Sequence, residues 1–112
     1  MTARRGEVWL IDFGEPVGSE PAGRRPGVVG SADRLNESRA GGVIVVPCTT
    51  KRRGLPSHIE IEPGESGLDE TSYAKCEDIK SVSEERLIAG LGAAGDEVLF
   101  ATARALRFLL DF

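Results

Sequence analysis

The chain has 112 residues, of which 40% are hydrophobic and 29% are charged, and its formal net charge is −4 at pH 7. This length predicts a single domain, residues 1–112, built around one core. The acidic balance excludes a protein that is held on nucleic acid by overall positive charge alone. No apolar run reaches membrane-spanning length, and no apolar segment follows the basic residues near the N-terminus. We therefore expect a cytoplasmic protein with no signal peptide and no membrane contact.

Three strands are predicted in the first half of the chain. Glu7–Phe13 is rich in β-branched and aromatic residues and lies between two glycines, which is typical of a strand. A long loop with several glycines and prolines follows and ends at Pro26. Gly27–Ser31 is a short second strand, and 32–42 is a polar loop. The most apolar run, Val43–Thr49, is the predicted central strand.

Further strands are predicted in the second half. Apolar and polar residues alternate in Ser57–Glu62, as they do in a half-buried strand. After a turn at Pro63–Gly67, Thr71–Val82 is predicted to be a further strand. Ser81–Glu84 fits a capping box that begins a short helical turn, and Leu87–Gly92 is predicted to be a last small strand.

The spacing of the apolar residues changes near the C-terminus. They recur there at three- and four-residue steps, as on one face of an amphipathic helix, at Val98, Leu99, Ala103, Leu106 and Leu110. An acidic pair opens this segment and arginines lie near its end, which matches the helix dipole. Many short strands and one terminal helix predict a mainly β fold, a small and strongly bent β-barrel with the helix packed on it.

Two segments concentrate polar groups next to apolar strands. The first, Gly18–Pro26, carries a hydroxyl, a carboxylate and two guanidinium groups at Ser19, Glu20, Arg24 and Arg25. The second, Pro47–Arg53, carries two hydroxyls and three cations at Thr49, Thr50, Lys51, Arg52 and Arg53. Loops can aim such side chains because a rigid scaffold holds their ends. We expect the two segments to face each other across one site that handles a phosphodiester.

Residues that commonly bind metals are sparse. Cys48 and Cys76 lie in separate apolar contexts without metal-type spacing, so we expect reduced, half-buried thiols. The single histidine, His58, is expected on the surface of its strand, and its ordinary pKa also makes it a candidate general base. No tight acidic cluster falls in either polar loop. We therefore expect chemistry that needs neither a metal nor a cofactor.

Short motifs follow one another in a recognisable order. They are Arg5-Gly6-Glu7-Val8-Trp9, Gly18-Ser19-Glu20, Arg25-Pro26 followed by Val28-Val29, Pro47-Cys48-Thr49-Thr50, Gly67-Leu68 and Arg86-Leu87. From about Arg4 to the C-terminal helix, this order resembles the MazF/PemK-like toxins. The resemblance implies an SH3-like barrel of the MazF/CcdB type, a homodimer, and a type II toxin with a cognate antitoxin protein. Such toxins cut single-stranded RNA at short sequences without a metal. They leave a 2′,3′-cyclic phosphate and a 5′-hydroxyl, and so inhibit translation and growth.

The resemblance also implies roles for individual residues. Arg25 and Thr49 match the family's catalytic arginine and threonine, and Glu20 matches the acidic residue beside them. RNA contacts are expected at Ser19, Arg24, Asn36, Thr50, Lys51, Arg53, Glu77 and Asp78. Two positions depart from the family pattern, because Pro21 and Asp78 stand where glutamine is common. The carboxylate of Asp78 repels phosphate, yet it can accept a hydrogen bond from an exocyclic amine of a base.

The acidity of each side chain determines which catalytic role it can take. A guanidinium stays protonated, so Arg25 is expected to stabilise charge on the phosphorane oxygens, with a hydroxyl hydrogen bond from Thr49. Glu20 is then the first choice to accept the 2′-hydroxyl proton. Structural roles remain open for several residues. Arg25 could form an ion pair with Glu20, Asn36 could form a turn, and the cations at Arg24 and 51–53 could be solvated.

Two other classes of function remain open. Related barrels serve non-catalytic toxins that poison a protein such as gyrase, since a fold does not fix a function. A degenerate interaction module is the other class; the acidic net charge favours it and the intact Arg25 and Thr49 pair argues against it. Cleavage of a defined RNA by pure protein in a chelator distinguishes these classes.

Overall fold

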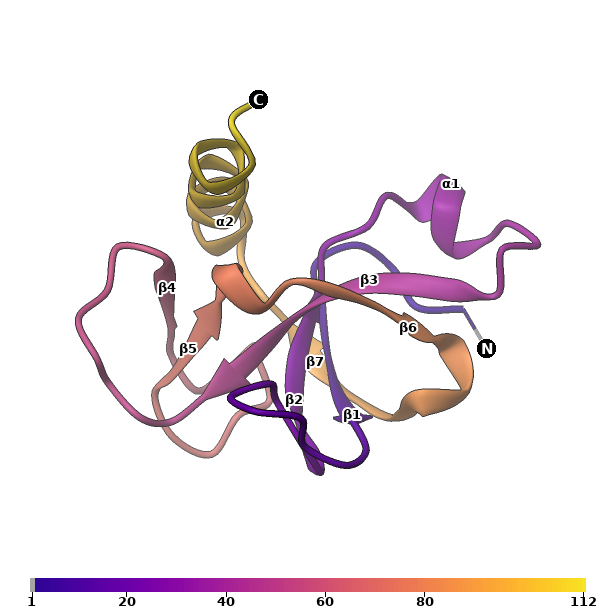
Figure 1. Cartoon of the computed structure of the whole chain (residues 1–112), viewed down its shortest axis with the longest axis horizontal. Helices are drawn as coiled ribbons and strands as arrows, with labels where there is room; N and C mark the ends of the chain where they lie inside the picture. The colour runs from indigo at the N-terminus through magenta and orange to yellow at the C-terminus, as the bar shows by residue number, and fades with distance from the viewer. Residues whose placement is uncertain (1) are drawn as a thin grey trace.

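The computed structural model describes residues 2–112 (Figure 1). Within that range the strands are β1 (Glu7–Asp12), β2 (Arg24–Val29), β3 (Gly42–Thr49), β4 (His58–Ile61), β5 (Ser72–Lys75), β6 (Lys80–Ser83) and β7 (Leu87–Ala93). The helices are α1 (Asp33–Asn36) and α2 (Asp96–Leu110), and the short 3-10 turns are η1 (Cys76–Asp78) and η2 (Glu84–Arg86). Neither helix of the described part has the length and apolar character that crossing a membrane requires.

Strand β3 is the centre of one antiparallel sheet. The hydrogen-bonded path runs β4-β5-β3-β2-β1-β7, and β6 pairs with the first half of β3. The second half of β3 pairs with β5 instead. Because one long strand has different partners along its length, the sheet bends strongly, as Figure 1 shows. The predicted central strand and the barrel-like, mainly β fold with a C-terminal helix are confirmed. In the described residues the path ends at β4 and β7 without closing.

Alternate residues of β3 contribute to two cores on opposite sides of the sheet. Val46 and Cys48 pack in one cluster, which α2 covers with apolar side chains that include Leu99 and Leu106. We call this side the helix face. The other cluster is Ala3, Trp9, Ile11, Phe13, Val29, Val43, Val45 and Val82. We call that side the Trp9 face. The alternation follows from the two-residue period of a strand.

The turn after β4 packs directly on β7. Gly67 has a φ of +74°, and a Cβ added there would collide with the Leu91 carbonyl oxygen. The amide of Ala93 donates to the carbonyl oxygen of Glu65 in the same turn at 2.8 Å. Both the positive φ and the close backbone therefore require glycine at this position. This requirement gives a physical reason for the Gly67-Leu68 motif.

Several element predictions are wrong in detail. The strand predicted over Thr71–Val82 is interrupted, because β5 and β6 pair with different halves of β3 and the chain must turn at η1 between them. The predicted loop 32–42 contains one helical turn, α1. The helical turn predicted from Ser81–Glu84 lies at η2, where the Ser83 hydroxyl accepts the capping hydrogen bond from the Glu85 amide.

The first polar segment is also shorter than predicted. Arg24 and Arg25 are not loop residues, because β2 begins at Arg24 and pairs with β1 from there. The two cysteines are free, as expected, but both are buried rather than half-buried. Burial, together with the nearby Cys76, raises the pKa of Cys48 to about 12. The thiols are therefore neutral core groups of the helix face.

Candidate active site

The two predicted catalytic residues lie on neighbouring strands. β2 and β3 pair through Gly27 and Pro47, at the end of their common ladder. Arg25 and Thr49 each lie two residues beyond this last pair, so the two would be level if the same register were continued. Residues that are level in an antiparallel pair project to the same face of the sheet. The register therefore supports one site that contains both side chains.

This arrangement continues across β5 to β4. Tyr73 pairs with Thr49 on one side and with Glu60 on the other. We call Arg25, Thr49, Tyr73 and Glu60 the polar row. Thr49 stands four positions after Val45, so the row lies on the Trp9 face. Along β3 this face therefore changes from apolar core to a polar surface where the strand ends.

Arg25 is half-buried and its base is fixed by the preceding turn. Its Nε donates a hydrogen bond to the Ala22 carbonyl oxygen at 3.1 Å. Among residues 2–112, the ion pairs are Arg4–Asp33, His58–Glu77 and Lys75–Asp78, so no carboxylate is paired with Arg25. The alternative in which Glu20 pairs with Arg25 to staple the loop is not seen. A backbone carbonyl therefore orients the guanidinium, and no carboxylate among residues 2–112 neutralises its charge.

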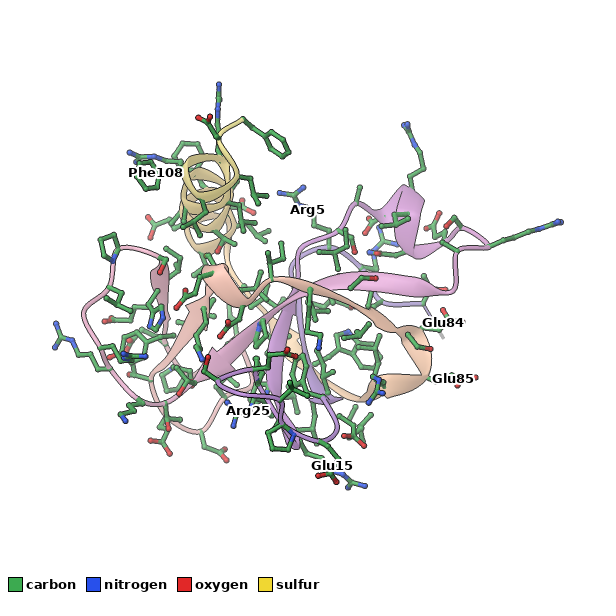
Figure 2. The ribbon with its side chains drawn as sticks, in the orientation of Figure 1. Arg5, Glu15, Arg25, Glu84, Glu85 and Phe108 are labelled. Carbon is green, nitrogen blue, oxygen red and sulfur yellow. The ribbon has the colours of Figure 1, made fainter. Side chains whose placement is uncertain are left out.

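The loop 14–23 is closed at its base and exposed along its middle. Phe13 donates its amide to Gly23, and Gly23 donates to Gly14, each at 2.8 Å. Arg86 adds a hydrogen bond from Nη1 to the Asp12 carbonyl oxygen at 3.1 Å. Ser19 and Glu20 are exposed in this loop. In Figure 2, Arg25 lies in the lower part of the view, as does this loop.

The segment after β3 brings positive charge next to Thr49. Thr49 is half-buried, and its hydroxyl oxygen accepts a hydrogen bond from the Lys51 amide at 3.2 Å. Thr50 and the three cations of 51–53 are exposed. Within the described chain none of these cations is in an ion pair. An anionic ligand at Thr49 would therefore meet a positive surface.

The expectation of a surface histidine is wrong. The His58 side chain is only 2% exposed, and its Nε2 lies 2.7 Å from Oε2 of Glu77. Ser57 donates its hydroxyl hydrogen bond to the other Glu77 oxygen at 2.9 Å. The physical reason is that η1, which the sequence did not predict, carries Glu77 against the start of β4. His58 is thus engaged inside the protein.

Glu77 is held in its charged form by these contacts. Burial would raise the pKa of its carboxyl, but hydrogen bonds from His58, from its own backbone and from Ser57, with charge attraction to His58, lower it below the ordinary value. The Glu77 carboxylate therefore anchors the end of the 50–57 segment. The neighbouring Asp78, also predicted to contact RNA, lies 2.8 Å from the Lys75 ammonium.

Other predicted contacts are placed away from the polar row. Asn36 is buried in α1, where its Nδ2 donates to the Ser31 carbonyl oxygen at 3.1 Å. That helix precedes the start of β3, whereas Thr49 ends it (Figure 1). Arg24 is exposed and pairs with Asp12 in the β1–β2 ladder. The structure thus brings Arg24 to the strand beside Arg25 and leaves Asn36 in a structural role.

The polar row also contains side chains that the sequence analysis missed. The sequence analysis assigns no role to Tyr73 or Glu60. The available signal was the alternation in 57–62 and 72–75, which places polar side chains on one face of each strand. Their common row became visible only with the pairing of β4, β5 and β3, because strand partners cannot be read from one sequence.

Comparison with known proteins gives the class to which this fold and site belong. Residues 4–110 match the family of PemK-like, MazF-like toxins of type II toxin–antitoxin systems. That match covers nearly the whole chain. The protein belongs to this family.

Individual relatives agree with this assignment. The chain is 37% identical to the probable endoribonuclease MazF5 of Mycobacterium tuberculosis, over 99% of this chain and 97% of the relative. It is 34% identical to endoribonuclease MazF9 of the same organism, over 96% of each chain. The crystal structure of MazF from Deinococcus radiodurans superposes with a TM-score of 0.87 at 24% identity, covering 100% of this chain and 99% of that one. At that identity the superposition supports the fold.

Proposed function

We propose that this protein is a toxin that cleaves single-stranded RNA in the cytoplasm without a metal and is neutralised by a cognate antitoxin. The observation that supports the proposal is the β2–β3 pairing, which ends at Gly27 and Pro47, two residues from Arg25 and from Thr49, beside cations that are in no ion pair among residues 2–112. A fixed cation beside a hydroxyl donor suits the charge that grows on a phosphorane. Full-length relatives named as endoribonucleases support the same chemistry.

The cleavage follows from the chemistry of RNA itself. The 2′-oxygen attacks the adjacent phosphorus while its proton passes to a base, and the bond from phosphorus to the 5′-oxygen breaks. That oxygen takes up a proton, so the products are a 2′,3′-cyclic phosphate and a 5′-hydroxyl. Arg25 neutralises the phosphorane oxygens and Thr49 donates to one of them. Glu20, exposed on the 14–23 loop, is the proposed base.

The exposed cations at Lys51, Arg52 and Arg53 would draw RNA toward Thr49. Their effect is local, because the whole chain has a net charge of −4. Binding through such contacts weakens as salt rises, since phosphate contacts release counterions. Ser19 in the 14–23 loop and Arg24 in β2 are exposed and are further proposed RNA contacts. Glu77, in contrast, acts through its contact with His58.

The proposed toxin is a homodimer that uses α2. Phe108 and Phe112 are 85% and 86% exposed, and the last turns of α2 expose further apolar side chains. In Figure 2, Phe108 lies at the end of the view away from Arg25. A groove of about 550 Å³ lies between α2 and the 55–57 segment. An exposed apolar patch of this kind indicates a protein contact.

The antitoxin is proposed to bind through an acidic and apolar tail that folds as it binds and competes with RNA for the cations. Light scattering should report a dimer at micromolar concentration, and Phe108→Ser should weaken it. A monomer with full cleavage activity would contradict the dimer. A cognate antitoxin whose affinity is unchanged by Lys51→Ala and which leaves RNA unprotected would contradict the tail.

Cleavage itself is tested with pure protein, a defined single-stranded RNA and an excess of chelator. Sequencing the fragment ends should show cuts at a short recurring sequence, with a cyclic phosphate on one side and a hydroxyl on the other. Arg25→Ala protein purified in the same way controls for contaminating nucleases. If the wild-type protein leaves RNA intact yet inhibits gyrase, the non-catalytic toxin is the correct class instead.

A further inference from the structure

A second pocket adjoins the proposed cleavage site. It has a volume of about 300 Å³ and is lined by Arg52, Gly54, Leu55, Pro56, His58, Glu60 and Tyr73. Tyr73 is the residue paired with Thr49 in the β3–β5 ladder. Side chains directly opposite in such a ladder are in contact range. We call this the Tyr73 pocket. It lies next to the proposed cleavage site because Tyr73 lines the pocket and pairs with Thr49.

One residue that lines this pocket has a polar atom without a hydrogen-bond partner among residues 2–112. His58 Nε2 bonds to Glu77, while Nδ1 is buried and has no hydrogen-bond partner in the described part of the chain. Because the Glu77 carboxylate is ionised and only accepts, Nε2 carries the hydrogen of this bond. Nδ1 therefore donates when His58 is protonated in the ion pair with Glu77, and it accepts when the imidazole is neutral. A buried polar atom without a partner is costly, and such exceptions in folded proteins call for a specific explanation.

The other polar groups of the pocket select the kind of ligand. Glu60 is exposed and no ion pair to it exists among residues 2–112. Its carboxylate repels a phosphate but accepts hydrogen bonds from an amino group of a base. Tyr73 offers an aromatic ring on which any base can stack. Arg52 also lines the pocket, and its positive charge suits a neighbouring phosphate.

We propose that the Tyr73 pocket binds the base of a nucleotide next to the scissile phosphate, and that it prefers a base with an exocyclic amine over uracil. The proposal rests on the proposed RNA cleavage and deepens it by adding a specificity subsite. Tyr73 supplies stacking and Glu60 accepts from the amine. Arg25 and Thr49 then act on the scissile phosphate next to that nucleotide.

The pocket is tested with Tyr73→Leu, which keeps apolar volume but removes the ring, and with Tyr73→Phe, which keeps the ring. RNAs with every base at each position around the mapped cut report preference. We expect Tyr73→Leu to raise KM by roughly 10- to 100-fold, the scale of one lost base–aromatic stack. Its kcat should stay close to that of the wild type. Tyr73→Phe should behave like the wild type.

Glu60→Ala tests the base preference separately. This variant should cut RNAs with an amine-bearing base and with uracil at the subsite about equally, whereas the wild type should favour the amine. Circular dichroism and thermal melting of each variant check the fold. Unchanged KM and unchanged base preference in both Tyr73→Leu and Glu60→Ala would overturn the subsite while leaving the proposed cleavage intact.

A measurement of RNA binding tests this proposal independently of the proposed cleavage. An RNA with a 2′-deoxy sugar at the cut position lacks the attacking hydroxyl, so its affinity is measured without cleavage. We expect Tyr73→Leu to weaken its binding by the same factor by which it raises KM. If the wild type bound this RNA but cut no RNA, cleavage would fail and the subsite would be judged from binding alone. If the wild type bound no RNA, both proposals would fail.

Discussion

The two faces of the sheet differ in how far their apolar character extends. The helix face is apolar at Val46 and Cys48 of β3 and at Ile61 of β4, in the cluster on which apolar side chains of α2 pack. The Trp9 face is equally apolar around Val43 and Val45, but it becomes the polar row near Thr49. The same strands thus build stability on one side and a site on the other. The face that each side chain of β3 occupies follows from its parity, and whether it packs in a core or lies at the site follows from its position along the strand.

The largest expected effect is the loss of Arg25 from the polar row. Arg25→Ala should lower the rate of RNA cleavage by about 10²–10³-fold, the scale for removing one oriented electrostatic donor. The thermal midpoint should stay near that of the wild type, because Arg25 is only half-buried and forms no ion pair in the described chain. Single-turnover cleavage and thermal melting measure the two quantities.

Two variants sharpen that test. Arg25→Lys should recover only part of the rate, because an ammonium lacks the planar, two-pronged geometry of a guanidinium. Arg39→Ala removes an equally positive but remote, exposed side chain and should leave the rate unchanged. A folded Arg25→Ala protein that cuts at the wild-type rate would move the active site away from the polar row.

The helix face should respond in the opposite way. Ile61 is 2% exposed and packs in the cluster beneath α2. Ile61→Ala should lower the free energy of unfolding by about 2–5 kcal/mol, since it removes buried methyl groups and leaves a cavity. The folded fraction should retain the wild-type kcat. Urea unfolding gives the first quantity, and cleavage well below the melting temperature gives the second. A large fall in kcat without loss of stability would contradict the claim that the helix face serves stability and not cleavage.

The sequence predicted most of this division. The apolar run at β3, the alternation in β4 and the helical spacing of α2 are local patterns, so one chain is enough to reveal them. The motifs around Arg25 and Thr49 also identified the family, and the pairing of β2 with β3 brings the strands that carry these two residues together. Their roles in cleavage are predictions that the Arg25→Ala and Thr49→Ala variants test.

The rest of the site depends on contacts between distant segments. His58 looked like a surface residue because its strand alternates, but η1 carries Glu77 against it from nineteen positions further along the chain. Asn36 looked like a turn or an RNA contact, but it is buried against Ser31. Tyr73 could not be placed beside Thr49 without knowing that β5 pairs with β3. Such partners are not encoded in any local window of sequence.

A smaller effect is expected at Thr49. Thr49→Ala should slow cleavage by about tenfold, because it removes one hydrogen bond to a charged oxygen and leaves the Arg25 cation in place. Thr49→Ser keeps the hydroxyl and should retain most of the rate. Both variants should melt like the wild type, since Thr49 is only half-buried. If Thr49→Ala lost stability and Thr49→Ser did not recover the rate, Thr49 would belong with the structural face.

The smallest expected effect concerns Glu77, which is close to the polar row but serves the fold. Its pKa is lowered in the folded protein, where burial opposes the shift but the hydrogen bonds from His58 and Ser57 outweigh burial. A carboxyl with a lowered folded pKa stabilises the protein above its unfolded pKa, near the ordinary value of 4.5. That stabilisation is lost as pH falls through the folded value.

Glu77→Gln should therefore lower the melting temperature at pH 7 by a few degrees at most, because the carboxylate is 35% exposed and partly screened. The difference between wild type and variant should shrink as the pH is lowered below about 4.5. Thermal melting of both proteins from pH 7 to pH 3 measures this convergence. A constant difference across that range would show that the Glu77 charge does not anchor the 50–57 segment.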